Sequence, residues 1–89
     1  MSGGAFTYLQ YKIHDIVEGI QDIIDRNDSM PPQLRYSEKT IEEFKNGIYF
    51  LQAAEIYAQR IDWLISGDDS EETFHKRLKE DLNDVNEYF

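Results

Sequence analysis

Two rows of apolar side chains run at helical spacing along residues 41–65, which is more apolar surface than one helix of a small bundle normally buries. The first row comprises Ile41, Phe44, Ile48, Leu51, Ala58 and Ile65. The second row, beside it, comprises Phe50, Ala54, Tyr57, Ile61 and Leu64. The rest of the chain can cover one row. The other row predicts contact with a further partner, most simply a second copy of the same protein.

The chain around this segment is short. Its 89 residues indicate one domain, 1–89, with a modest core that self-association would supplement. It contains no cysteine, which excludes disulfide bonds and thiolate metal sites and favours the cytoplasm over secretion. Residues 1–6 lack the basic patch and apolar run of a signal peptide, and we expect no contact with a membrane because no stretch is apolar enough to cross one.

The charge of the chain restricts its partners. The 18 acidic side chains outnumber the 9 basic ones and give a net charge of −9. Such a field repels a phosphate backbone, so we expect no direct binding to nucleic acid. A basic protein partner fits this charge better. The aromatic content of 13% argues against disorder and supplies rings for a core or an interface.

Apolar periodicity predicts an all-α fold with three helices, at about 7–25, 38–65 and 69–86. In the first helix, apolar side chains recur every three or four residues and share one face. They are Phe6, Leu9, Ile13, Ile16, Val17, Ile20, Ile23 and Ile24. Pro31 and Pro32 stop this pattern and force an extended connection to the second helix.

Capping residues mark the ends of the other two helices. Ser37 is suited to cap the second helix, and Ser66-Gly67 is suited to stop it. Asp69 is placed to cap the third helix, with Glu72 in the capping-box position three residues later. The short break between these two helices predicts that they form an antiparallel hairpin, with the first helix across or alongside it.

Acidic side chains recur along the opposite side of the first helix. Asp15, Glu18, Asp22 and Asp25 stand at positions i, i+3, i+7 and i+10, so they share one face. This acidic row is either a solvated helix surface or a docking face for a basic partner.

A metal site is a further hypothesis for the same helix. His14 and Glu18 lie one turn apart with Asp15 beside them, and a metal ion there would need a third ligand from elsewhere. Together with pairs such as Asp81 and Asp84, they raise the alternative of a metal-dependent nucleotide hydrolase. The dense acidic motifs of such hydrolases are incomplete here, so we predict no enzymatic activity, no metal site and no cofactor.

Two acidic residues of the long helix, Glu55 and Asp62, fall on or beside its first apolar row, with Arg60 near them. A carboxylate that faces a core raises the free energy of the folded state unless it is paired. We therefore expect these carboxylates to pair with an arginine or lysine from another helix or another subunit.

Aromatic rings open the first helix, at Tyr8 and Tyr11. They can either fill a core or, with Lys12, Arg26 or Arg35, stack on a nucleotide base and pair with its phosphate across a subunit boundary. This second interpretation predicts an oligomeric sponge for a small nucleotide signal.

The opening MSGGAFTY at 1–8, joined to AEIYAQRIDWLISGDD at 54–69, resembles small uncharacterised proteins of phages and prophages. The second block continues to Leu78, so the resemblance covers about half of the chain. It carries no assigned catalytic residue. The resemblance implies an accessory protein that neutralises a host factor in the host cytoplasm, and some such families are helical oligomers that sequester cyclic nucleotides between subunits.

The favoured interpretation is a non-enzymatic binding protein that forms a homo-oligomer through the long helix and acts stoichiometrically on a host protein. The residues expected at the oligomer or partner interface are Phe50, Ala54, Tyr57, Ile61, Trp63 and Leu64. The nucleotide sponge, with a small nucleotide as its ligand, is the alternative, and the hydrolase is a third reading.

Overall fold

The computed structural model describes residue 6 and residues 8–88, which form three α-helices and two short 3₁₀ turns and contain no strand. The helices are α1 (Tyr11–Arg26), α2 (Glu38–Ile65) and α3 (Glu71–Tyr88). The turns, η1 (Asn27–Ser29) and η2 (Pro32–Leu34), lie between α1 and α2. The predicted all-α fold with three helices is confirmed, and α2 and α3 form the expected hairpin.

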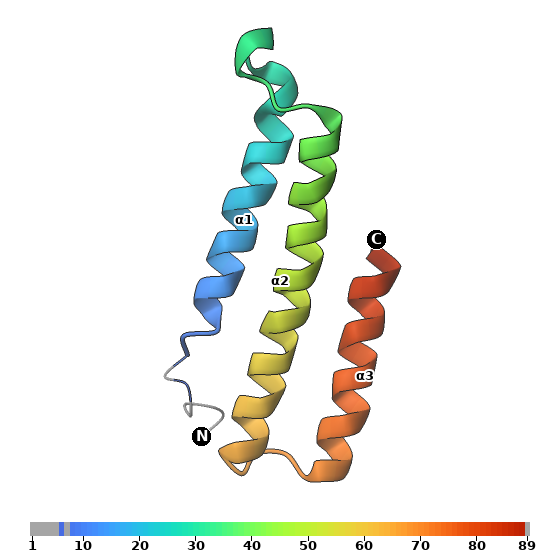
Figure 1. The fold of residues 1–89 in the computed structure, drawn as a ribbon. Helices are drawn as coiled ribbons and strands as arrows, with labels where there is room; N and C mark the ends of the chain where they lie inside the picture. The colour runs from blue at the N-terminus through green and yellow to red at the C-terminus, as the bar shows by residue number, and fades with distance from the viewer. Residues whose placement is uncertain (1–5, 7, 89) are drawn as a thin grey trace.

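The three helices lie side by side in one flat layer, with α2 in the middle (Figure 1). α1 and α3 each pack against α2, and their described residues do not contact each other. The extents of 52 × 26 × 13 Å fit this arrangement. The 26 Å width matches three neighbouring helices at axis separations of about 8–10 Å, and the 13 Å depth is half of that width.

A single layer has little interior. The radius of gyration is 16.2 Å, whereas a compact domain of this length has about 12 Å. Among the described apolar side chains, only Val17 of α1 and Ile48 of α2 are buried. Ile48, Glu55 and Asp62 recur every seven residues along one side of α2, and Glu55 and Asp62 contact residues at the start of α1. The first predicted row, around Ile48, therefore faces α1.

The start of α1 differs from the prediction. The helix begins at Tyr11 rather than near residue 7, and Gln10 at its N-terminal boundary makes no side-chain capping bond. Tyr8 has a φ of 60°, a left-handed conformation that an α-helix cannot contain. Residues 8–10 form turns instead, and Thr7 lies outside the described residues.

The connection from α1 to α2 follows the proline pattern. α1 ends at Arg26, and the two 3₁₀ turns flank Pro31. The Asn27 side chain holds the connection closed, because its Oδ1 accepts from the Tyr36 N–H at 2.9 Å and its Nδ2 donates to the Tyr36 carbonyl at 3.1 Å. Ser37 then caps α2 as predicted, with its Oγ accepting from the Thr40 N–H at 3.3 Å.

The predicted cap of α3 is wrong by one residue. Gly67, with a φ of 85°, ends α2 in the left-handed conformation that glycine favours. The N–H groups of Asp68 and Asp69 still donate to the Trp63 carbonyl, at 2.8 and 3.3 Å, so the turn extends past Asp69. Ser70 caps α3 in its place, with its Oγ accepting from the Thr73 N–H at 3.1 Å.

A buried polar network joins the start of α1 to the end of α2. Asp62 is fully buried, and its carboxylate accepts hydrogen bonds from Gln10 Nε2 at 2.8 Å and Ser66 Oγ at 3.2 Å. Gln10, also buried, donates from the same Nε2 to Gln59 Oε1 at 2.9 Å. These two donors to Asp62 are neutral side chains. The network fixes the register of α1 on α2.

Replacing Gln10 by leucine should lower the free energy of unfolding by about 1–3 kcal/mol, because the buried Asp62 carboxylate loses a donor. Urea denaturation at one fixed protein concentration measures this change. The matched control is Gln21→Leu, which removes an exposed hydrogen bond to Asp25 and should shift stability by no more than about 0.5 kcal/mol. Equal effects of the two variants would contradict a structural role for the network.

Candidate functional site

The second predicted row of α2 is exposed on one flat side of the layer. Phe50 is 68% exposed, Tyr57 is 45% exposed and Ala54 between them is also exposed. Ile61 and Leu64, further along α2, are partly buried. Neither α1 nor α3 therefore covers the centre of this row.

Apolar side chains of α1 continue the same side of the layer. Ile16 and Ile23 lie seven residues apart and are 51% and 40% exposed, and Leu9, in the turn before α1, is 61% exposed. Ile16 and Ile23 lie roughly 160–180° around α1 from His14, whose ring reaches towards Glu55 on the other side of the layer. Ile23 also borders a shallow hollow with Met30 and Leu34, so apolar surface extends onto the connection to α2.

We call this side of the layer the apolar face. Its residues are Ile16 and Ile23 of α1 with Phe50, Ala54, Tyr57 and Ile61 of α2. The prediction included the α2 part but assigned every apolar residue of α1 to a single face. The seven-residue spacing of Ile16 and Ile23 was the signal of a second row on α1.

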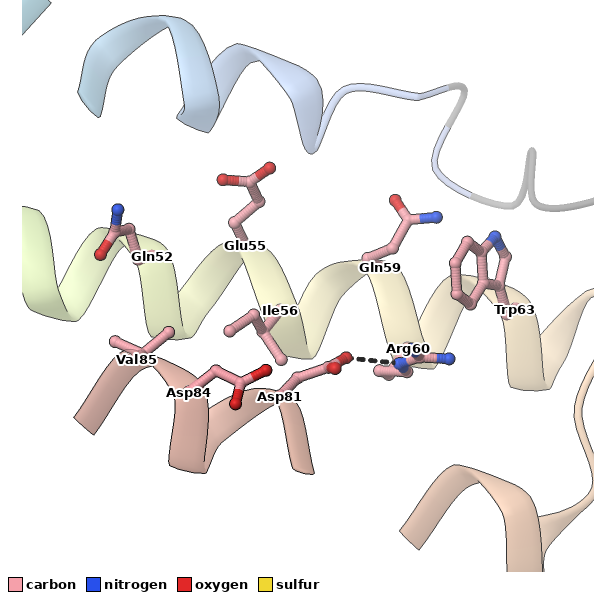
Figure 2. A pocket seen from close by; sticks show the side chains of 9 residues that line it. All are labelled: Gln52, Glu55, Ile56, Gln59, Arg60, Trp63, Asp81, Asp84 and Val85. Carbon is pink, nitrogen blue, oxygen red and sulfur yellow. Dashed lines mark hydrogen bonds and ion pairs between the residues drawn. The ribbon is translucent and has the colours of Figure 1, made fainter. Parts of the chain in front are cut away.

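The opposite side, the polar face, contains a hollow of about 390 Å³ between α2 and α3 (Figure 2). Its lining residues are Gln52, Glu55, Ile56, Gln59, Arg60, Trp63, Asp81, Asp84 and Val85. Trp63 lies about 180° around α2 from Ala54, so the structure separates it from the exposed row with which we had grouped it.

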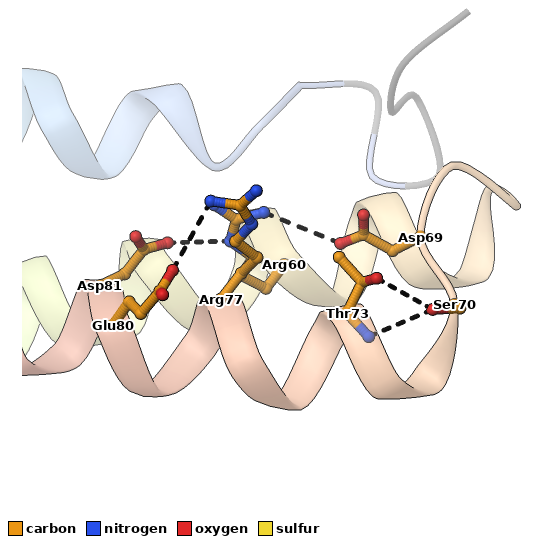
Figure 3. A network of polar contacts seen from close by, with 7 residues as sticks. All are labelled: Arg60, Asp69, Ser70, Thr73, Arg77, Glu80 and Asp81. Atoms are coloured by element: carbon orange, nitrogen blue, oxygen red, sulfur yellow. Dashed lines mark hydrogen bonds and ion pairs between the residues drawn. The ribbon is translucent and has the colours of Figure 1, made fainter.

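Arg60, which lines this hollow, connects α2 to α3 and to the turn between them (Figure 3). Its Nε donates to Asp81 Oδ2 at 2.8 Å, its Nη1 lies 3.7 Å from Asp69 Oδ2, and its guanidinium carbon is 4.6 Å from the centre of the Trp63 ring. Arg60 is only 16% exposed and Asp69 only 13%. One carboxylate, that of Asp81, therefore accepts a hydrogen bond from this guanidinium, and a second, that of Asp69, lies close to it.

The residues predicted to bind a nucleotide are divided between the two ends of α1. The rings of Tyr8 and Tyr11 stack at 6.1 Å near its start, where Lys12 is exposed. Arg26, paired with Asp22 at 2.9 Å, lies at its end, and Arg35 donates to the Met30 carbonyl in the connection. The 16 residues of α1 separate the two groups by roughly 20 Å, so one chain does not bring them together.

The acidic row of α1 is exposed, and three of its four members have partners one turn away. Glu18 lies 2.9 Å from His14, Asp22 pairs with Arg26, and Asp25 accepts from Gln21. Asp15 is exposed as well. Local pairs of this kind contribute little to stability, and they leave the row open to a partner.

A metal site needs convergent ligands. His14 Nδ1 lies 3.9 Å from Glu55 Oε1, and its Nε2 contacts Glu18. Within the described part of the chain, no group of three or more histidine, aspartate or glutamate side chains is placed to hold a metal ion. In the same part, no helix is long and apolar enough to span a membrane.

Comparisons with known proteins give no match to a family model, to a curated protein or to a solved structure. The two faces of the layer are therefore the features from which a function can be inferred. One face offers uncovered apolar surface, and the other offers a hollow rimmed by carboxylates.

Replacing Arg60 by lysine should lower the free energy of unfolding by about 1–3 kcal/mol, because lysine keeps the charge but cannot reach Asp69 and Asp81 with one planar group. Denaturation followed by the fluorescence of Trp63, the one tryptophan of the chain, reports on this contact directly. Arg77→Lys is the matched control, because Arg77 is 54% exposed and lies 3.6 Å from Glu80, so a change below about 0.5 kcal/mol is expected. Indistinguishable curves for the two variants would contradict the role given to Arg60.

Proposed function

We propose that this chain is a non-enzymatic interaction protein that self-associates through its apolar face and acts stoichiometrically on a partner protein. The observation that carries the proposal is the exposed row of α2 in the middle of a layer one helix thick. Soluble monomers rarely expose an apolar patch of several hundred square ångströms unless it is an interaction site.

The total accessible surface supports this proposal. The chain exposes 6503 Å², whereas a compact monomer of 10.5 kDa exposes about 5,400 Å². The excess of roughly 1,100 Å² exceeds the surface of about 800 Å² that each partner buries in a standard interface. The flat layer therefore has enough surplus surface to supply one complete interface.

The polar face is the proposed surface for the partner protein. It would stay open after the apolar faces had paired, and its hollow is rimmed by Glu55, Asp81 and Asp84. The net charge of −9 would attract a basic partner from a distance. The resemblance to phage and prophage accessory proteins suggests a host protein as this partner and the host cytoplasm as the place of action.

Replacing Tyr57 by aspartate should reduce the native multi-subunit particle to single chains, because each copy would bring a charge into the contact. Sedimentation velocity at matched concentrations measures this change. Gln52→Asp, five residues earlier in α2 and on the polar face, adds the same charge and should leave the particle intact. A native chain that sediments as one 10.5 kDa particle even at high concentration would overturn the proposal.

The acidic row of α1 is proposed as an additional part of the partner surface. Neutralising it with the triple change Asp15→Asn, Glu18→Gln and Asp22→Asn should slow association with a basic partner by about tenfold, and salt should slow binding of the native chain. Surface plasmon resonance with the identified partner measures both rates. Unchanged association rates would indicate that the acidic row is only a solvated helix surface.

The nucleotide sponge remains the alternative, and the stacked, half-exposed rings of Tyr8 and Tyr11 are the observation in its favour. It would require Arg26 or Arg35 to come from another copy, since α1 separates them from the rings. Thermal stabilisation of the native chain by cyclic dinucleotides would favour the sponge over a protein partner.

Release of phosphate from nucleotides in the presence of Mg²⁺ or Mn²⁺ would instead support the hydrolase hypothesis, which involves His14, Asp15 and Glu18.

A further inference from the structure

We infer that two copies of this chain stack apolar face against apolar face, with their α2 helices crossing at Ala54, so that the working unit is a two-layer dimer of six helices. This inference rests on the proposed self-association. It adds that the molecule covering the apolar face is a second copy of the chain, and that the contact between the two copies is symmetric.

A second layer would complete the architecture. Protein domains bury a core between at least two layers of secondary structure, and this chain supplies one. Its radius of gyration of 16.2 Å is that of a compact protein of twice its length, for which about 16 Å is expected. Adding a second layer about 9 Å away would raise the radius of gyration only to about 17 Å, so the stacked pair would be compact while the single chain is not.

The size of the face fits a stable dimer. The Cα extents of 52 × 26 Å enclose roughly 1,350 Å², against the 800 Å² or so that each partner buries in a standard interface. About two-thirds of the face would therefore suffice. The exposed apolar residues of α1 and α2 lie on either side of the line between these two helices, which gives the contact both length and width.

Charge favours a second copy on this face and not on the other. The residues that define the apolar face carry no charge, from Ile16 and Ile23 on α1 to Phe50, Ala54, Tyr57 and Ile61 on α2. The polar face holds Glu55, Asp81 and Asp84, and the chain has a net charge of −9. Two copies can thus approach through their apolar faces while the carboxylates of the two hollows point away from each other.

Ala54 is the natural crossing point. It lies between Phe50 and Tyr57 in the exposed row and has the smallest side chain of the three. Two helices approach most closely where their side chains are small, and the flanking rings can then pack on either side of the opposite alanine. In a symmetric contact the same patch serves both copies, so a residue at the crossing point meets its own counterpart.

Cysteine cross-linking tests this geometry cleanly because the chain contains no cysteine. Ala54→Cys should form a disulfide-linked dimer under mild oxidation, since a disulfide needs Cα atoms within about 7 Å. Gln52→Cys, on the polar face of the same helix, is the control and should remain uncross-linked at the same concentration. Native mass spectrometry of the unmodified chain should show a particle of twice 10.5 kDa.

A second measurement tests the dimer even if a cysteine variant fails to fold. If the single layer is unstable alone, the thermal midpoint of the native chain should rise with protein concentration, and Phe50→Asp should raise the dimer dissociation constant by about 100-fold or more.

The inference is overturned if Ala54→Cys and Gln52→Cys cross-link equally, or if the thermal midpoint of the native chain does not depend on its concentration. A multi-subunit particle that Tyr57→Asp dissociates, but in which Ala54→Cys does not cross-link, would refute this geometry while leaving the proposed self-association standing. Recovery of the native chain only in a one-to-one complex with a different protein would place that protein on the apolar face and refute the second copy.

Discussion

The structure depends on a single packing constraint, which is that α1 and α3 both pack on α2 and not on each other. In a three-helix bundle each helix touches two others, and the three apolar stripes meet along a common axis. Here the outer helices lie on opposite sides of α2, so each can bury only the stripe that it turns towards α2 (Figure 1). Val17 and Ile48 are therefore the only buried apolar side chains among the described residues, and the other apolar side chains whose burial is described are partly buried or exposed.

Polar contacts compensate in part for the missing core. The buried Asp62 carboxylate links the end of α2 to Gln10 at the start of α1, and Arg60 links α2 to Asp81 of α3 and to Asp69 in the turn. Both contacts lie in the C-terminal third of α2. Buried polar contacts specify one arrangement because only one register satisfies them, whereas apolar stripes tolerate small shifts. The flat layer therefore has a defined geometry despite its small interior.

Much of this fold could be predicted from the sequence, because local rules decide it. The bounds of α2 followed from Ser37 and Gly67, whose roles depend only on neighbouring backbone groups. The start of α1 and the cap of α3 were missed, because Tyr8 adopts a left-handed conformation and the turn after α2 extends through Asp69. The exposure of the Phe50 row agreed with the expectation of an uncovered stripe. The grouping of Trp63 with this row did not agree, because the nine residues between Ala54 and Trp63 amount to about two and a half helical turns and place Trp63 on the opposite side of α2.

The hollow on the polar face has a consequence for valency. If two layers pair through their apolar faces, their two hollows point in opposite directions, on the outer surfaces of the assembly. A rigid globular target of similar size cannot reach around the dimer to occupy both. Each chain would then engage its own target molecule, and the dimer would bridge two targets without gaining avidity for either one alone. A target that is itself multimeric would be cross-linked into larger assemblies, so the same small protein could either sequester or aggregate what it binds, according to the symmetry of its target.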